Sequence, residues 1–179
     1  MTSQTSTSAE KQSAKHREFP WGISFGAVTG VSPKIGNALL PTAAGGVLIR
    51  FDSANQAVAV NVLETASVSL VDALPHRAIE IHVIDFAIRK RFQHLSALAP
   101  LKQYRLYDKR ETAAKAIEDL ESLARFRHHE LLNDATPTLS DYNRESRGFE
   151  RYRLLLLNLN DFPGEDAKNR ERLLSLLDA

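Results

Sequence analysis

The stretch RFDSANQA, residues 50–57, is where this sequence would be expected to hold a phosphate. Its first two residues end the apolar run GGVLIRF (45–51), which we predict to be a buried strand. Its later residues begin the segment 53–74, which we predict to be a helix. A phosphate loop at such a turn needs glycines, whose backbone N–H groups curl around the phosphates, and a lysine that neutralises them. The stretch contains neither glycine nor lysine. Its position therefore favours a nucleotide site, but its residue types do not.

Acidic side chains end two further predicted strands, at the kind of position where α/β proteins place their sites. Asp85 lies near the end of RAIEIHVIDFAI (77–88), and Asp161 lies near the end of ERYRLLLLNLNDF (150–162). Either carboxylate could replace a lost metal ligand. Because phosphate-binding groups are missing, we favour strand-end capping or an ion pair for both.

Basic and histidine side chains form two other candidate sites. Arg89, Lys90 and Arg91 follow the strand predicted at 77–88 and could contact a nucleic-acid backbone, although a solvated loop is the simpler interpretation. His128 and His129 are neighbours on a predicted helix, where successive side chains point about 100° apart. Such a pair is badly placed to share one metal ion, so we expect no metal site.

The elements that must position these residues alternate between strand and helix. RLYD (105–108) is a short predicted strand, and KRETAAKAIEDLESLARFRHHELLN (109–133) is the clearest helix, with Asp108 as its expected N-cap. A terminal helix is expected in EDAKNRERLLSLLDA. The long apolar runs indicate a parallel sheet that is covered on both faces. The sequence therefore predicts an α/β fold with βαβ crossovers.

The length and the composition favour one domain. A chain of 179 residues that is 43% hydrophobic can form one domain with a substantial core. Residues 1–18 are polar and lack an apolar period, so we expect a disordered tail followed by a single α/β domain over 19–179. Short β-like pieces after Trp21 suggest that this domain begins with a hairpin, or with an edge strand and a loop.

The net charge and the lack of cysteine limit the kinds of binding partner and the cellular compartment that we expect for this protein. The formal net charge is +1, which gives no general reason to expect a polyanionic partner. The absence of cysteine excludes disulfides and thiolate metal sites and fits a reducing compartment. No apolar run approaches the roughly 20 residues of a membrane span. We therefore expect a cytoplasmic protein without a membrane partner.

Six segments of the chain, taken in order, resemble the nucleotide-binding core of FtsK/SpoIIIE-type DNA translocase ATPases. The segments are GGVLI, VAVNVL, the strand ending in IHVID, the helix ending in LARFRHHELL, LSDYNRES and YRLLLLNLNDF. They span about residues 45–165, and ARFRHHELL…LSDYN is the most distinctive part. The resemblance implies a RecA-like, P-loop NTPase-type parallel sheet with helices on both faces, incomplete relative to a full motor core. It is closest to the degenerate first ATPase-like domain of proteins that also contain an active motor domain.

Transferred to this sequence, the resemblance implies that both nucleotide motifs are degenerate. Aligning VAVN with the VGVN of the family places residues 50–57 over the pattern GxxxxGK[ST], and both glycines, the lysine and the hydroxyl are missing. The Walker B strand should end in an acidic pair that orients Mg²⁺ and polarises water, but Asn158 and Leu159 stand there. The degenerate Walker A positions of interest are Arg50, Asp52, Ser53, Asn55, Gln56 and Ala57.

We therefore expect a catalytically inactive FtsK/SpoIIIE-like ATPase-type domain, acting as a structural, docking or regulatory module of a DNA-translocase-like assembly. Its expected partners are another NTPase or motor domain, or a second copy, with DNA possible and no cofactor.

Two alternatives stay open. One is an atypical NTPase that holds ATP and Mg²⁺ with the help of Arg50 and Gln56, or through residues from another chain. The other is a non-catalytic DNA-binding module that uses Arg89, Lys90 and Arg91.

Overall fold

The computed structural model describes residues 19–20, 22–27, 37–41, 46–146 and 148–177. The first described strands, β1 (Gly22–Ala27) and β2 (Asn37–Pro41), form an antiparallel hairpin, and β1 lies against the helix α2. This confirms the hairpin expected at the start of the domain. The polar tail predicted for residues 1–18 lies outside the described residues.

The centre of the fold is a parallel sheet with the strand order β4-β3-β5. The middle strand β3 (Ile79–Ile84) pairs in parallel with β4 (Tyr104–Tyr107) on one side and with β5 (Tyr152–Leu157) on the other. Every residue of β3 is buried. β3 and β5 lie within the apolar runs predicted as strands, and β4 overlaps the short strand predicted at 105–108. Their parallel pairing confirms the α/β class.

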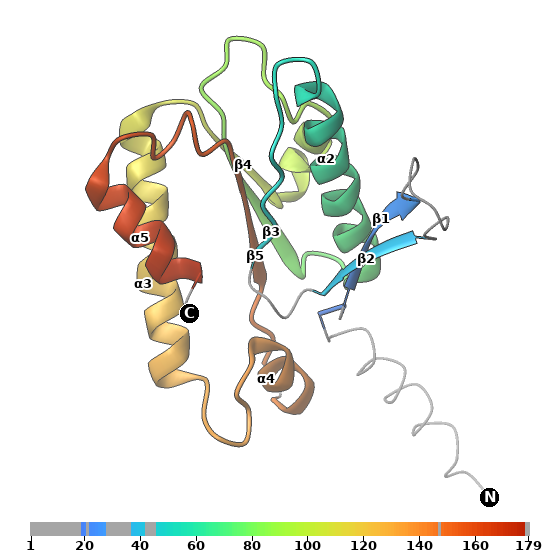
Figure 1. The fold of residues 1–179 in the computed structure, drawn as a ribbon. Coiled ribbons are helices and arrows are strands. Elements are labelled where there is room, and N and C mark those ends of the chain that lie inside the picture. Colours follow the sequence, from blue (N-terminus) through green and yellow to red (C-terminus); the bar gives the residue numbers. More distant parts are fainter. Residues whose placement is uncertain (1–18, 21, 28–36, 42–45, 147, 178–179) are drawn as a thin grey trace, which may run out of the picture.

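Helices cover both faces of this sheet, as Figure 1 shows. On one face lie α2 (Gln56–Ala73) and the short 3₁₀ helix η2 (His94–Leu101); on the other lie α3 (Arg110–Glu130) and α5 (Ala167–Leu177). A short helix α4 (Leu139–Glu145) lies between α3 and β5 in the chain. None of the helices among the described residues is long and apolar enough to cross a membrane.

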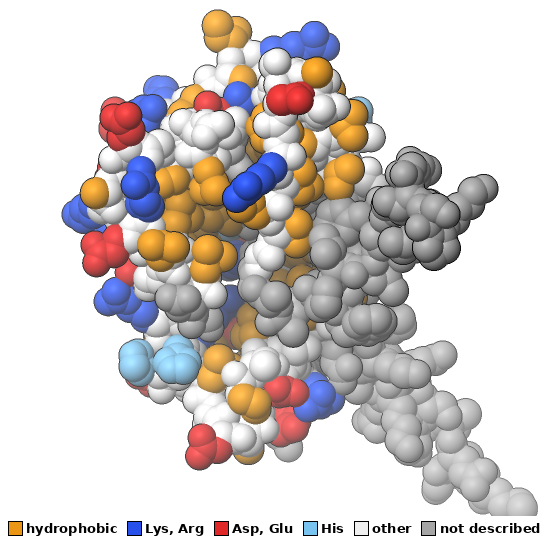
Figure 2. All heavy atoms as spheres, in the orientation of Figure 1, with side chains coloured by type: hydrophobic (Ala, Val, Ile, Leu, Met, Phe, Trp, Pro, Cys, Tyr) orange, Lys and Arg blue, Asp and Glu red, His pale blue; other side chains and the backbone are white. Residues whose placement is uncertain are grey.

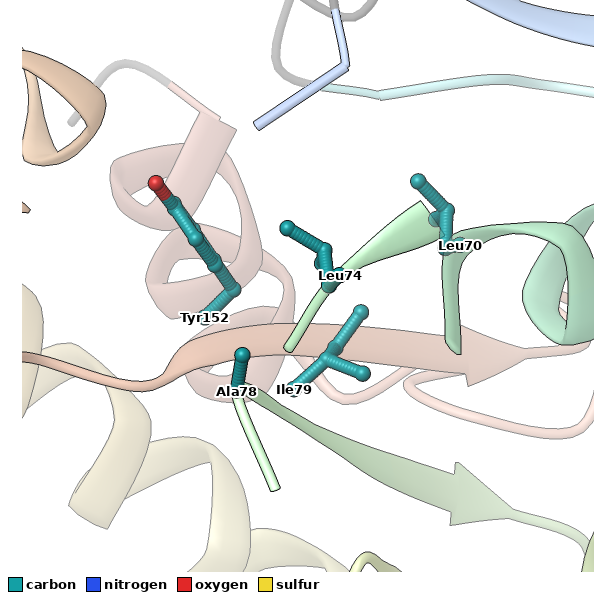
Figure 3. Packing of buried hydrophobic residues seen from close by; sticks show 5 residues of the cluster. All are labelled: Leu70, Leu74, Ala78, Ile79 and Tyr152. Atoms are coloured by element: carbon teal, nitrogen blue, oxygen red, sulfur yellow. The ribbon is translucent and has the colours of Figure 1, made fainter. Parts of the chain in front are cut away.

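The face of the sheet toward α2 is entirely apolar in the middle strand. Figure 3 shows its amino-terminal part, where side chains from the end of α2 meet residues at the start of β3 and β5; these are Leu70, Leu74, Ala78, Ile79 and Tyr152. Ile81 and Val83 continue the same face and pack with Phe92, Leu95 and Leu156. Burial of this stripe is the main force that holds α2 and η2 on the sheet.

The opposite face is apolar only near the carboxyl ends of the strands. There Ile84 packs with Ala113 and Ile117 of α3 and with Phe162. Farther toward the amino ends of the strands, this face presents charged side chains, described below.

One predicted strand is wrong. Residues 46–50 have no regular secondary structure, and no described segment pairs with them. Val47, Leu48 and Phe51 are exposed, and Leu48 retains 68% of its accessible surface. The apolar run predicted burial, but a run of this length does not specify which backbone will pair with it.

The predicted N-cap of α3 is also wrong. The residue before the helix is Lys109, with extended backbone angles and no capping side-chain hydrogen bond. The carboxylate of Asp108 lies 3.9 Å from the Lys90 ammonium instead. A cap depends on the exact residue at which the helix starts, and the pattern located that residue one position too early.

We predict that Leu70→Ala lowers the free energy of unfolding by about 2 to 5 kcal/mol, because it opens a cavity in the core between α2 and the sheet. Leu70 is 2% exposed, whereas Val58 on the same helix is 63% exposed. Val58→Ala is therefore the matched control, with an expected change of about 0.5 kcal/mol or less. Chemical denaturation followed by circular dichroism measures both. Equal losses in the two variants would contradict the packing of α2.

Candidate functional site

The turn before α2 is held closed by the side chain of Asp52. Its Oδ1 accepts hydrogen bonds from the backbone N–H groups of Ala54 and Asn55, both at 2.9 Å, and from the Asn55 side-chain amide at 3.0 Å. Asn55 is the N-cap residue but makes no side-chain capping bond, and Ser53 is exposed. A carboxylate thus occupies the donors that a phosphate oxygen would need in a phosphate loop.

The other residues that the resemblance aligned with the Walker A pattern do not converge on a common point. Arg50 is exposed and makes no ion pair with any described residue. Gln56 is half-buried at the first position of α2, and Ala57 is exposed. No arrangement of these side chains resembles a phosphate cradle.

The residues that the resemblance aligned with the Walker B pair, Asn158 and Leu159, lie in a turn. The carbonyl oxygen of Asn158 accepts hydrogen bonds from the N–H groups of Asp161 and Phe162, both at 3.0 Å, and its Oδ1 accepts one from Asn160 at 3.0 Å. Leu159 is exposed. Asn158 therefore shapes the chain after β5, and neither it nor Leu159 can activate water.

The structure joins the two strand-end aspartates through one arginine. The guanidinium of Arg91 donates a hydrogen bond of 2.5 Å to Asp161 Oδ2, and its Nη1 lies 3.4 Å from Asp85 Oδ1. Asp85, which has no exposed surface, also accepts the backbone N–H of Ala87 at 3.0 Å and that of Arg91 at 2.5 Å. The strand-end ion pair that the sequence favoured is therefore present, and its partner is Arg91, which the sequence analysis placed in a solvated loop or, alternatively, at a nucleic-acid contact.

This ion pair borders a small hollow at the carboxyl edge of the sheet. The hollow has a volume of about 260 Å³ and is lined by Phe86, Ala87, Arg91, Arg110, Asn160 and Asp161. It lies between the ends of β3 and β5, whose following segments lead to opposite faces of the sheet. Parallel α/β sheets bind ligands at such switch points. Arg110 lies 5.4 Å from the centre of the Phe86 ring, a cation–π contact that holds it at the rim.

Two of the three basic residues considered for DNA contact, for which a solvated loop was the simpler interpretation, are engaged within the protein. Lys90 Nζ donates to the backbone oxygen of Asp85 at 3.1 Å and lies near Asp108, while Arg91 binds Asp85 and Asp161. Arg89 is exposed. The stretch thus serves first to order the loop after β3.

The sequence analysis missed a buried polar group on the α3 face of the sheet. Glu80 of β3 is 2% exposed and forms ion pairs with Arg105 of β4 and, at 3.2 Å, with Arg153 of β5. His82, two residues along β3, is hydrogen-bonded through Nδ1 to the Tyr107 hydroxyl at 2.9 Å. The sequence contains a pattern that could have predicted this group: Glu80 and His82 alternate with isoleucines and a valine, which indicates one polar face on an otherwise apolar strand.

Burial determines the protonation of this group. The pKa of His82 is lowered to about 4, mainly by burial; the charge of Glu80 opposes this change, and the charges of Arg153 and Arg105 contribute to it. Burial also raises the pKa of Tyr107. At neutral pH the imidazole is neutral and the phenol is protonated. The His82 Nε2 atom has no hydrogen-bond partner among the described residues.

The remaining histidine candidates, His128 and His129, lie on α3. The rings of His128 and His129 lie 5.6 Å apart beside a hollow of about 480 Å³ between α3 and α5. Among the described residues, no group of three or more histidine, cysteine, aspartate or glutamate side chains could hold a metal ion.

Comparisons with known proteins give no assignment for this chain: no family model matches it, and neither a curated protein nor a solved structure does.

We predict that Asp85→Ala lowers the free energy of unfolding by about 3 kcal/mol, because two backbone N–H groups lose their acceptor and Arg91 loses one carboxylate. Asp108, also directly after a strand, is the matched control, since its carboxylate is about half exposed. Asp108→Ala is expected to cost about 0.5 kcal/mol or less. Urea denaturation distinguishes them, and an Asp85→Ala protein as stable as the control would contradict the structural role of the ion pair.

We predict that His82 makes stability fall as the pH is lowered from about 6.5 to about 4, by up to about 3 kcal/mol. The pKa of His82 is lower in the folded chain, so the unfolded chain takes up the proton first, and the loss levels off below the folded pKa. The measurement is the pH dependence of unfolding in wild type, in His82→Gln and in the exposed-residue control His76→Gln. The dependence should weaken in His82→Gln alone. Identical slopes in all three would contradict a buried neutral imidazole.

Proposed function

We propose that this chain is a catalytically inactive ATPase-type domain of the FtsK/SpoIIIE kind, with a RecA-like sheet, that acts as a docking or regulatory module in a DNA-translocase-like assembly. The order of the six resembling segments in the sequence supports a relationship to FtsK/SpoIIIE-type ATPases. The parallel sheet with helices on both faces is compatible with it.

The turn at residues 52–55 is the observation that most supports the loss of ATP chemistry. The Asp52 carboxylate is hydrogen-bonded to the N–H groups that open α2, so a phosphate would have to displace an anion that is part of the chain. The turn has no lysine to balance the charge of a triphosphate. A nucleotide would meet repulsion there.

The carboxyl edge of the sheet supports the same conclusion. A hydrolytic site needs a carboxylate that is free to bind Mg²⁺ or to polarise water. Asp85 and Asp161 are instead both bound to Arg91. These ion pairs join the loop after β3 to the loop after β5 and so stabilise the fold.

The surface favours a protein partner over DNA. Exposed apolar side chains occur in the segment before α2 and on α5, including Val47, Leu48 and Leu177. Lys90 and Arg91 already have intramolecular partners, which weakens the case for DNA contact through this loop. Docking onto another protein is therefore the preferred function.

We predict that isothermal titration of the protein with ATP and Mg²⁺ gives no saturable binding, because Asp52 fills the site of the phosphates and no cation replaces the missing lysine. Arg50→Ala is the matched variant, since Arg50 is the exposed cation nearest in sequence to the turn. It should behave as wild type. Micromolar binding that is lost in Arg50→Ala would contradict the proposal and favour the atypical NTPase.

A further inference from the structure

Three arginines from different elements lie close to Arg153 of β5. They are Arg105 of β4, Arg127 of α3 and Arg151, which directly precedes β5. Burial lowers the pKa of Arg153 most; the charge of Glu80 opposes this shift, and the charges of the three arginines add to it. The four guanidiniums are therefore near enough to repel one another. We call these four residues the arginine cluster.

The carboxylates that contact the arginine cluster do not balance its charge. Glu80 pairs with the arginines of β4 and β5, and Glu150 pairs with that of α3 at 3.1 Å. Arg151 makes no ion pair with any residue that the structure describes. Asp119 of α3, which acts on the neighbouring tyrosine of β4, is already paired with Lys115 at 2.9 Å. Two carboxylates thus face four guanidiniums within the described chain, which leaves an excess of two positive charges.

The arginine cluster also contains a donor that is not used. The Nε atom of Arg127 is buried and has no hydrogen-bond partner among the described residues. The Nη2 atom of the same side chain donates to Glu150 and, at 2.6 Å, to the carbonyl oxygen of Arg151, which fixes the guanidinium. The Nε2 atom of His82, opposite Arg105 in the register, is a second buried nitrogen without a partner in the described chain. Since buried polar atoms normally have partners, these atoms indicate an additional bound group.

The space beside the arginine cluster is open to solvent. α3 has its last buried residue at Leu120, and none of the residues 121–130 is buried, so the second half of the helix does not pack closely on the sheet. The side chains of Arg153 and Arg127 remain 25% and 11% exposed. Figure 2 shows basic side chains set back between the layer of α3 and α5 and the segment before α2. A small ligand can therefore reach these guanidiniums.

We propose that the arginine cluster binds a phosphate group, as the free ion or as a monoester. A guanidinium presents its N–H groups in a fork that matches the oxygens of phosphate. A phosphate monoester carries a charge of about −1.5 to −2 at pH 7, which matches the excess charge of the cluster better than the single charge of a carboxylate or a phosphodiester does. This site lies away from the turn before α2, and it goes beyond the proposed docking function.

The ion pairs within the arginine cluster prepare it for this ligand. Glu80 and Glu150 hold three of the four guanidiniums in place without neutralising the group. A site whose side chains are ordered in advance loses less conformational entropy when the ligand binds. Bound phosphate would also relieve the repulsion among the arginines.

We predict that isothermal titration of the full chain with sodium phosphate, at pH 7 and constant ionic strength, gives saturable binding with a dissociation constant below about 1 mM. Arg127→Gln should weaken this binding at least about tenfold, because it removes a guanidinium with an unused N–H group. The matched control is Arg125→Gln on the same helix, whose side chain is 68% exposed and pairs with Glu121. The control should bind as wild type does, and circular dichroism checks that both variants fold.

Nuclear magnetic resonance of the wild-type protein supplies a second readout that does not depend on the folding of a variant. The Nε–H signal of Arg127 should shift as phosphate is added, because this group gains an acceptor, while that of Arg125 should not move. Absence of saturable binding, an unchanged Arg127 signal, or binding retained in a folded Arg127→Gln protein would overturn the inference and leave these groups to water.

Two further probes identify the form of phosphate and test the charge match. Glycerol phosphate, a monoester, should bind at least as tightly as the free ion if the ligand is phosphorylated and more weakly if it is inorganic phosphate; either result supports the site. Dimethyl phosphate, a diester with one negative charge, should bind at least about tenfold more weakly. A diester that binds as tightly as phosphate would refute the charge match and overturn the inference.

The phosphate titration is independent of the ATP titration. Its probes contain no nucleoside and no Mg²⁺, whereas in the ATP complex the metal binds the phosphate oxygens and offsets their charge. ATP binding that is lost in Arg50→Ala would refute the inactive-ATPase proposal without affecting the phosphate site. Failure of phosphate to bind would refute the site and leave the docking proposal unchanged.

Discussion

The complete burial of β3 is the constraint on which the rest of the structure depends. In a strand with neighbours on both sides and helices on both faces, a polar group without a partner destabilises the fold. Glu80 and His82 are nevertheless part of β3. The register provides ion-pair partners for the Glu80 carboxylate, because Glu80 lies opposite Arg153 of β5 and His82 lies opposite Arg105 of β4. A slip of one residue in either neighbour would remove an arginine from the buried carboxylate, so the charges specify the pairing that the apolar residues stabilise.

The need to pair buried polar groups also determines the contacts at the carboxyl edge of the sheet. Asp85 is fully buried at the end of β3, and its carboxylate is satisfied by two backbone N–H groups and by Arg91. Arg91 in turn holds Asp161 after β5. The two loops that would border a ligand in an active α/β protein are thus fixed to each other. An edge closed in this way leaves the exposed apolar side chains of the segment before α2 and of α5 as the better candidate for function.

Much of the architecture was accessible from sequence because it depends on long apolar runs and helical periodicity. β3, β5 and the helices α2, α3 and α5 fall within their predicted segments, and β4 begins one residue before the strand predicted at 105–108. The failures are local and share a cause. GGVLIRF has the composition of a buried strand, yet residues 46–50 pair with nothing described, and η2 and α4 are too short to give a periodic signal. At the site, Asp85 and Asp161 were recognised as strand-end residues. The arginine that joins them, Arg91, was instead expected in a solvated loop with a possible nucleic-acid contact.

The sequence by itself determined the α/β class, the parallel sheet and the absence of glycine and lysine at 50–57, because each follows from residue types within a short window. Only the tertiary structure decided which residues meet: that Arg91 neutralises Asp85 and Asp161, that Glu80 lies between arginines of two different strands, and that the edge of β5 stays unpaired within the described chain. These contacts join residues that are far apart in sequence. No local pattern encodes them, because strand order and register are set by the burial of the whole sheet.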